Sequence, residues 1–131
     1  MRANYGLIGG RTNLHGIWDG YLAERAISTP PGEASGLIAS VPRAERDRLG
    51  QGAAADWSRE GWQAARDLAY RTALGDPCGP LPPGRPALRE HQVQSLIPAV
   101  RRQVLAGGLR LARLLDEALS SGAPVTRPPP R

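Results

Sequence analysis

The sequence predicts an all-α fold, and two observations support this class. Apolar residues recur at three- and four-residue steps in the stretches 13–27, 56–74 and 95–120, which is the spacing of one helix face. Gly and Pro are plentiful, at 16 and 13 of 131 residues, and they cluster in the connections between these stretches. Aromatic residues make up only 5% of the chain, so the core of one modest domain must come from Leu, Ala, Val and Ile.

The first helix is predicted to follow a short apolar run, Tyr5–Ile8, which has the pattern of a strand. Asn13 is a suitable N-cap, since its side-chain oxygen can accept the free N–H groups of a first turn. The helix is expected to end near Ile27, before a Pro-Pro-Gly connection. Its apolar stripe consists of Leu14, Ile17, Trp18, Tyr21 and Leu22.

Two helices are predicted in the middle of the chain. The shorter one follows Ser40, with Pro42 in its first turn and Gly50 near its end. Asp56 is predicted to cap the longer one, which is followed by a proline-rich loop, 78–86. One face of the longer helix consists of Trp57, Gly61, Ala65, Leu68 and Thr72.

The last helix is predicted to start at Ser95, with Pro98 in its first turn, where a missing N–H costs little. Two adjacent glycines, Gly107 and Gly108, suggest that another helix approaches closely, because glycine in an exposed helix interior costs about 1 kcal/mol. The residues from Ser120 onward are predicted to be a disordered, proline-rich tail. The expected apolar stripe consists of Val100, Val104, Gly107, Leu111, Leu115 and Ala118.

The segment Thr12–Asp19 carries the strongest chemical signal. His15 and Asp19 are four residues apart, so on a helix they project from one face about one turn apart. An imidazole nitrogen and a carboxylate oxygen at that separation can both reach one zinc ion at about 2.0–2.2 Å. The spacing alone is equally compatible with a simple hydrogen bond between the two side chains.

Three landmarks in order resemble the zinc-dependent S1/P1 nuclease family. The sequence TNLHGIWD, 12–19, is similar to the motif with which that family supplies a histidine and an aspartate to zinc. Trp57 with the following Arg59-Glu60 resembles the start of a later family helix. The segment Gln103–Ala112 resembles the family's closing helix. The resemblance covers nearly the whole chain except its tail.

The resemblance implies a compact helical bundle of the phospholipase C/nuclease P1 type with three zinc ions in a cleft. It implies hydrolysis of single-stranded DNA and RNA, with His15 and Asp19 as metal ligands. The family's other ligands precede this motif. The chain is therefore predicted to be incomplete at its N-terminus, with 1–119 as the C-terminal part of the nuclease domain and 120–131 as the tail. We expect the isolated chain to be inactive, and to self-associate or pair with the missing N-terminal half.

The charge balance is basic, with 17 Arg, no Lys and 12 acidic residues, for a formal charge of +5. Such a surface suits a polyanion such as nucleic acid, although it is also ordinary in an Arg-rich chain. The arginines of the last helix could bind phosphate. They are predicted instead to form the solvated outer face of that helix, opposite its apolar stripe. These arginines are Arg101, Arg102, Arg110 and Arg113.

Other reactive or aromatic side chains are assigned structural roles. His91 follows the proline-rich loop and is predicted to be a solvated loop histidine. Cys78, the only cysteine, has no neighbouring base in the sequence to activate it, and Trp18 and Trp57 lie on apolar stripes and are predicted to be core. No segment resembles a signal peptide or a membrane span, although the resembled family is typically secreted or periplasmic.

Two alternatives to a nuclease remain open. The chain could be a basic helical module that binds nucleic acid or a protein partner without a metal, in which case His15 and Asp19 are dispensable. A helix-turn-helix regulator is the weaker alternative, since no short turn joins two helices of suitable length.

Overall fold

The computed structural model describes residues 13–80, 83 and 88–121, and this part of the chain is helical with no strand. The predicted all-α class is therefore confirmed. The predicted strand Tyr5–Ile8, most of the proline-rich loop and the tail beyond residue 121 lie outside the described residues.

The first helix is continuous and changes its winding in the middle. It consists of α1 (Leu14–Gly16), the π-helical segment η2 (Ile17–Leu22) and α2 (Ala23–Ser28). Asn13 caps it as predicted, because the Gly16 N–H donates to Asn13 Oδ1 at 2.8 Å. The predicted stripe is also confirmed, since Leu22 is fully buried and Ile17, Trp18 and Tyr21 pack against the same cluster.

Two short helices follow, and the sequence predicted only one of them. The first, α3 (Glu33–Ala39), was missed because its seven residues are too few to show a periodic stripe. The second, α4 (Arg43–Gly50), ends at the expected glycine, although Pro42 is its N-cap and not part of its first turn.

The second long helix also contains a π-helical segment. It consists of α5 (Ala54–Ala64), η3 (Ala65–Tyr70) and α6 (Arg71–Leu74), and it ends at Gly75 in the left-handed region, with φ of 82°. The N-cap is Ala53 and not Asp56. Asp56 still satisfies the helix start, because it reaches back from the first turn and accepts the Ala53 N–H at 3.0 Å.

The last helix, α7 (Glu90–Ser120), has Arg89 as its N-cap, where the sequence predicted Ser95. Gln92 Oε1 accepts the Arg89 N–H at 2.8 Å and caps the true start. Pro98 is consequently inside the helix, where it removes one backbone hydrogen bond. The predicted start at Ser95 is wrong because burial of Val93 and its neighbours outweighs this loss.

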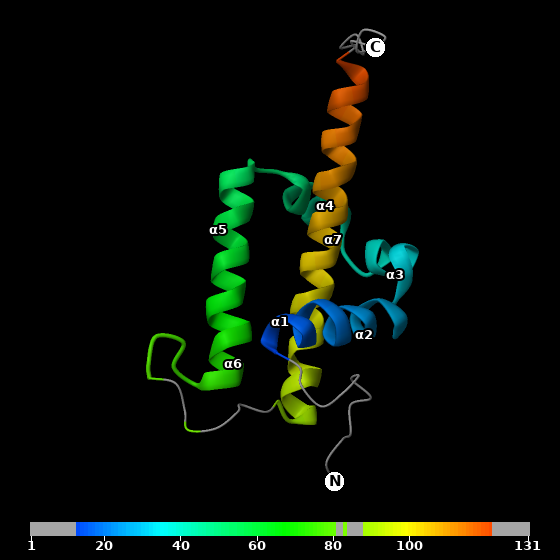
Figure 1. Cartoon of the computed structure of the whole chain (residues 1–131). Helices are drawn as coiled ribbons and strands as arrows, with labels where there is room; N and C mark the ends of the chain where they lie inside the picture. Colours follow the sequence, from blue (N-terminus) through cyan, green and yellow to red (C-terminus); the bar gives the residue numbers. More distant parts are fainter. Residues whose placement is uncertain (1–12, 81–82, 84–87, 122–131) are drawn as a thin grey trace, which may run out of the picture.

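α7 is the central element: the first helix, α3 and α4 pack along it, and the α5–η3–α6 helix lies to one side (Figure 1). One buried cluster joins α7 to the first helix, with Trp18 and Leu68 packed against it; the buried residues are Leu22, Ala26, Val93, Leu96, Ile97 and Val100. A second cluster joins α7 to α3 and α4, through Leu37, Leu49, Leu105 and Ala106. The core is thus two small clusters along one helix.

The C-terminal end of α7 projects beyond the helices that surround it (Figure 1). The predicted apolar stripe is wrong beyond Val100, because the buried face there consists of Leu105, Ala106 and Arg110. Val104, Leu111, Leu114, Leu115 and Leu119 are exposed instead. A Cβ atom added to Gly107 or Gly108 would have no neighbouring atom within 4 Å. The close approach of another helix that these glycines predict is therefore absent from the described part of the chain. None of the helices described here is long and apolar enough to cross a membrane.

We expect this exposed face to make the chain self-associate and bind hydrophobic dyes, because contiguous exposed apolar surface on a small domain drives association. The double change Leu111→Gln and Leu115→Gln should lower dye fluorescence and shift the sedimentation distribution toward the monomer. Ile38→Gln, which changes an exposed side chain on α3, is the matched control and should do neither. A wild-type chain that is monomeric and does not bind dye would contradict this expectation.

Candidate metal centre

His15 and Asp19 come together at the start of the first helix. His15 Nε2 lies 3.2 Å from Asp19 Oδ2, and the two side chains are 84% and 59% exposed. Asn13 fixes the helix start, and Asp19 is in η2, where the π-helical winding begins. Such π segments inside α-helices are frequent at functional sites. The predicted pairing on one face is therefore present.

The pair fits one part of a zinc site. Two ligands at about 2.0–2.2 Å in a tetrahedron lie about 3.3–3.6 Å from each other, which is close to the observed 3.2 Å. Imidazole nitrogen and carboxylate oxygen are both ordinary zinc ligands. Within residues 13–80, 83 and 88–121, however, no group of three or more His, Cys, Asp or Glu side chains could hold a metal ion. The described part of the chain thus offers two candidate ligands, whereas a zinc site normally needs at least three.

The pair opens onto a hollow of about 330 Å³ between the first helix and η3. Trp18 and Tyr70 line it together with His15, Asp19 and small residues of α5 and η3. The small side chains, Gly61, Ala64, Ala65 and Ala69, leave the space open. The hollow is large enough for part of a nucleotide beside the two potential ligands.

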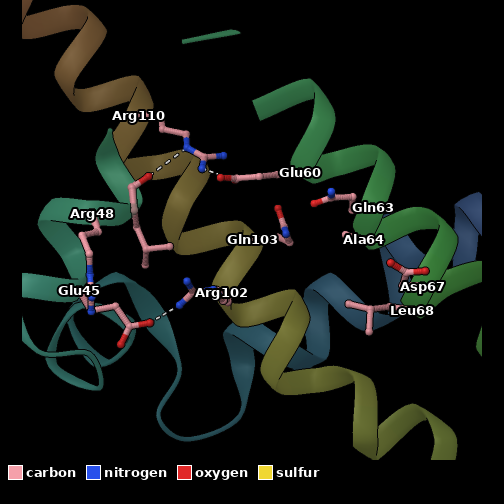
Figure 2. A pocket seen from close by; sticks show the side chains of 11 residues that line it. Glu45, Arg48, Glu60, Gln63, Ala64, Asp67, Leu68, Arg102, Gln103 and Arg110 are labelled. Atoms are coloured by element: carbon pink, nitrogen blue, oxygen red, sulfur yellow. Dashed lines mark hydrogen bonds and ion pairs between the residues drawn. The ribbon is translucent and has the colours of Figure 1, made fainter. Parts of the chain in front are cut away.

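A second hollow of about 700 Å³ adjoins the first one, since Ala64 and Gln103 line both. It lies between α4, the α5–η3 helix and α7, and Figure 2 shows acidic and basic side chains facing each other across it. Arg102 pairs with Glu45, and Arg110 pairs with Glu60. Charged side chains of both signs therefore line this larger hollow, and their net charge is close to zero.

Of the four arginines of α7 that the sequence favoured as a solvated face, Arg102 is exposed and pairs with Glu45, but the other three reach neighbouring helices. Arg110 is buried, and its Nε donates to the Leu49 carbonyl at 3.0 Å. Arg101 Nε donates to the Ala26 carbonyl at 3.0 Å. Arg113 donates to the Gly52 carbonyl at 2.7 Å. For these three residues the prediction is wrong, because long arginine side chains reach across from the helix and satisfy carbonyls at or just beyond the ends of neighbouring helices.

The two tryptophans predicted to be core have different surroundings. Trp18 packs against the cluster that joins the first helix to α7. Trp57 is half-buried but belongs to neither buried cluster. The guanidinium groups of Arg110 and Arg113 lie 5.4 and 5.3 Å from the centre of its ring, and its Nε1 donates to the Gln51 carbonyl at 2.8 Å. Trp57 thus joins α5 to α7 through the two guanidinium groups, and to the end of α4 through one hydrogen bond.

The remaining reactive side chains lie away from the candidate centre. His91 is exposed as predicted, but it is the second residue of α7 and not part of a loop. Cys78 is exposed and unpaired in the turn after α6. The pair of Arg110 and Glu60 could not be predicted from local sequence patterns, because the two residues are 50 positions apart. The one signal in the sequence was that Glu60 belongs to the segment around Trp57 that resembles a family helix.

Comparison with known proteins gives one finding. A sequence model of the S1/P1 nuclease family matches residues 3–120, which include the complete His15–Asp19 pair. Comparisons with curated proteins and with solved structures found no match.

Proposed function

The chain belongs to the S1/P1 nuclease family, and on that premise we propose that His15 and Asp19 are two zinc ligands of a hydrolase acting on phosphodiester bonds in single-stranded DNA and RNA. The family match itself supports a nuclease-type function and a nucleic-acid substrate. One observation carries the finer proposal: the two side chains lie within the matched residues, with their donor atoms 3.2 Å apart beside a hollow.

The chain's own residues hold the two donors in place. Asn13 fixes the first turn, and the helix backbone sets the separation of His15 and Asp19. Zinc bound there would lower the pKa of a coordinated water and stabilise charge on the phosphoryl group. The small side chains of α5 and η3 leave room for the substrate next to the ligands.

We propose that the isolated chain has no complete catalytic centre. Two ligands do not fill a zinc site, and no third ligand stands near them within the described part of the chain. Further ligands would come from residues outside that part or from another polypeptide. On this proposal residues 1–119 act as one portion of a nuclease domain.

Zinc binding tests the assignment of the ligands. The purified chain is expected to retain less than one zinc ion per molecule after dialysis, because two exposed ligands bind zinc weakly. Elemental analysis measures the ratio, and titration with excess zinc should show weak binding that His15→Ala or Asp19→Ala removes. His91→Ala is the matched control, since His91 is exposed but lies on α7. Tightly held zinc in His15→Ala would show that the ligands are elsewhere.

A non-catalytic role is the second candidate, and the observation that favours it is that residues 13–80, 83 and 88–121 offer no third ligand beside His15 and Asp19. On this reading the chain binds nucleic acid or a protein partner without metal. The double change His15→Ala and Asp19→Ala would then leave every binding property of the chain unchanged. Loss of zinc binding together with loss of any reconstituted cleavage in this variant would exclude the non-catalytic reading.

A further inference from the structure

The side chains that could complete a zinc site beside His15 and Asp19 are few, and the structure describes all of them. The two histidines, the one cysteine and the 12 acidic residues of the sequence all fall within residues 13–80 and 88–121. No group of three or more of these side chains could hold a metal ion. A further side chain of these kinds therefore has to come from outside this one copy of the sequence. In a solution of the pure protein, its source is a second copy.

The separation of the two donor atoms suits a shared metal ion better than a strong ion pair. His15 Nε2 and Asp19 Oδ2 are 3.2 Å apart, whereas a charge-assisted N–H···O bond is about 2.7–2.9 Å long. Two zinc ligands in a tetrahedron lie about 3.3–3.6 Å from each other. One copy thus offers two of the four corners of a tetrahedron. Two copies related by a twofold axis offer all four.

The pair is accessible to a second copy. The side chains of His15 and Asp19 are 84% and 59% exposed. Each of them is followed in the sequence by a glycine, Gly16 and Gly20, which has no side chain to keep a second helix at a distance. A Cβ atom added to Gly20 would have no neighbouring atom within 4 Å, so the surface next to Asp19 is open.

The charges at the pair favour association through a metal ion over direct association. Among the described residues that line the adjacent hollow, Asp19 is the only acidic one and none is an arginine. No arginine of this lining therefore competes with zinc for the Asp19 carboxylate. Two carboxylates neutralise one divalent ion, but without the ion they repel each other. Association through this surface should therefore require the metal.

We propose that one zinc ion joins two copies of the chain through His15 and Asp19 of each copy. The inference rests on the proposed function for the assignment of these two side chains as zinc ligands, but it does not depend on nuclease activity. Four protein ligands leave zinc no open position for water, as in structural zinc sites. The joined state is therefore not hydrolytic, and it competes with pairing to any segment that supplies other ligands.

Sedimentation velocity across a zinc titration, at high chain concentration, tests the bridge. The full chain carries Leu111→Gln and Leu115→Gln, so that association through the exposed face of α7 does not mask the effect. The mass is expected to double from 14.0 kDa as zinc approaches one ion per two chains. It should fall again in a large excess of zinc, because each copy then binds an ion of its own. EDTA should restore the monomer.

Substitutions distinguish the two ligands from other donors. His15→Ala and Asp19→Ala should each abolish the zinc-dependent dimer. His91→Ala and Glu24→Ala are the matched controls, since they remove an exposed histidine and an exposed acidic residue elsewhere, and both should dimerise normally. Cobalt(II) in place of zinc should give the strong visible absorption of a four-coordinate ion, with its maximum at one cobalt per two chains.

The outcomes separate this inference from the proposed function. Zinc binding that His15→Ala removes, without a dimer at any ratio of zinc to chain, would overturn the bridge and leave the ligand assignment intact. Absence of zinc binding at any chain concentration would overturn both. A zinc-dependent dimer that persists in His15→Ala, or association that only increases with excess zinc, would also overturn the bridge. Circular dichroism of each variant excludes misfolding as the cause of a loss.

Discussion

The purified 131-residue chain is expected to cleave single-stranded DNA at no more than the background rate in zinc-containing buffer. The reason is the ligand count, since zinc activates water only when it is held with an open position by enough protein donors. His15 and Asp19 alone would leave zinc mostly bound to solvent and readily lost. Gel analysis of a labelled strand over hours measures the rate.

On the proposed function, activity should appear when further zinc ligands are supplied beside His15 and Asp19. A homologous family segment that carries the other zinc ligands, either fused to the chain or co-expressed with it, is expected to restore cleavage. In the restored complex His15→Ala and Asp19→Ala should each reduce the rate at least about 100-fold, since changes of the groups that only support metal ligands already cost about 10- to 100-fold. His91→Ala should leave it unchanged. Robust hydrolysis by the chain alone, abolished by His15→Ala, would show that the centre is complete without such a segment.

The local parts of the candidate site could be predicted from the sequence, because they depend on neighbours along the chain. Asn13 capping and the four-residue step from His15 to Asp19 both follow from helix geometry within two turns. The all-α class follows from the same periodicity. These features needed no knowledge of which helix packs against which.

The predictions that were wrong concern features that depend on tertiary contacts. The start of α7 was placed at Ser95 because a proline inside a helix is normally unfavourable, and only the burial of Val93 and Leu96 shows why the helix begins earlier. The apolar stripe on the second half of α7 indicated a buried face, yet the buried face there contains Arg110. A hydrophobicity pattern cannot identify an arginine whose partners are 50 and 61 residues away.

Arg110 is the residue whose loss we expect to destabilise the chain most. It is only 8% exposed, and α5 itself contains no buried residue. The contacts of Arg110 with Glu60 and with the Trp57 ring therefore attach α5 to α7 (Figure 2 shows the pair with Glu60). Arg110 also satisfies the Leu49 carbonyl at the end of α4, so three helices meet at one guanidinium.

Arg110→Met is expected to lower the free energy of unfolding by about 2–3 kcal/mol. Leaving the buried Leu49 carbonyl without a donor costs about 1–3 kcal/mol. Loss of the ion pair adds less than a fully buried pair would, because Glu60 is half exposed and regains water. Since a domain is stable by only about 5–15 kcal/mol, the change should be obvious in the midpoint of urea unfolding.

The matched control for Arg110→Met is Arg43→Met, which removes an exposed arginine with one long contact to Asp47 and should change stability by less than about 0.5 kcal/mol. Hydrogen exchange distinguishes a general loss of stability from local release of a helix. If Arg110 attaches α5 as the contacts indicate, amides of residues 54–64 should lose protection first in Arg110→Met, while amides of α7 around Val93 and Val100 should keep theirs until global unfolding. An unchanged midpoint with unchanged exchange in α5 would mean that the contacts of Trp57 with Arg113 and with the Gln51 carbonyl hold α5 in place without Arg110. The geometry favours attachment through Arg110, because α5 offers α7 no buried apolar side chain of its own.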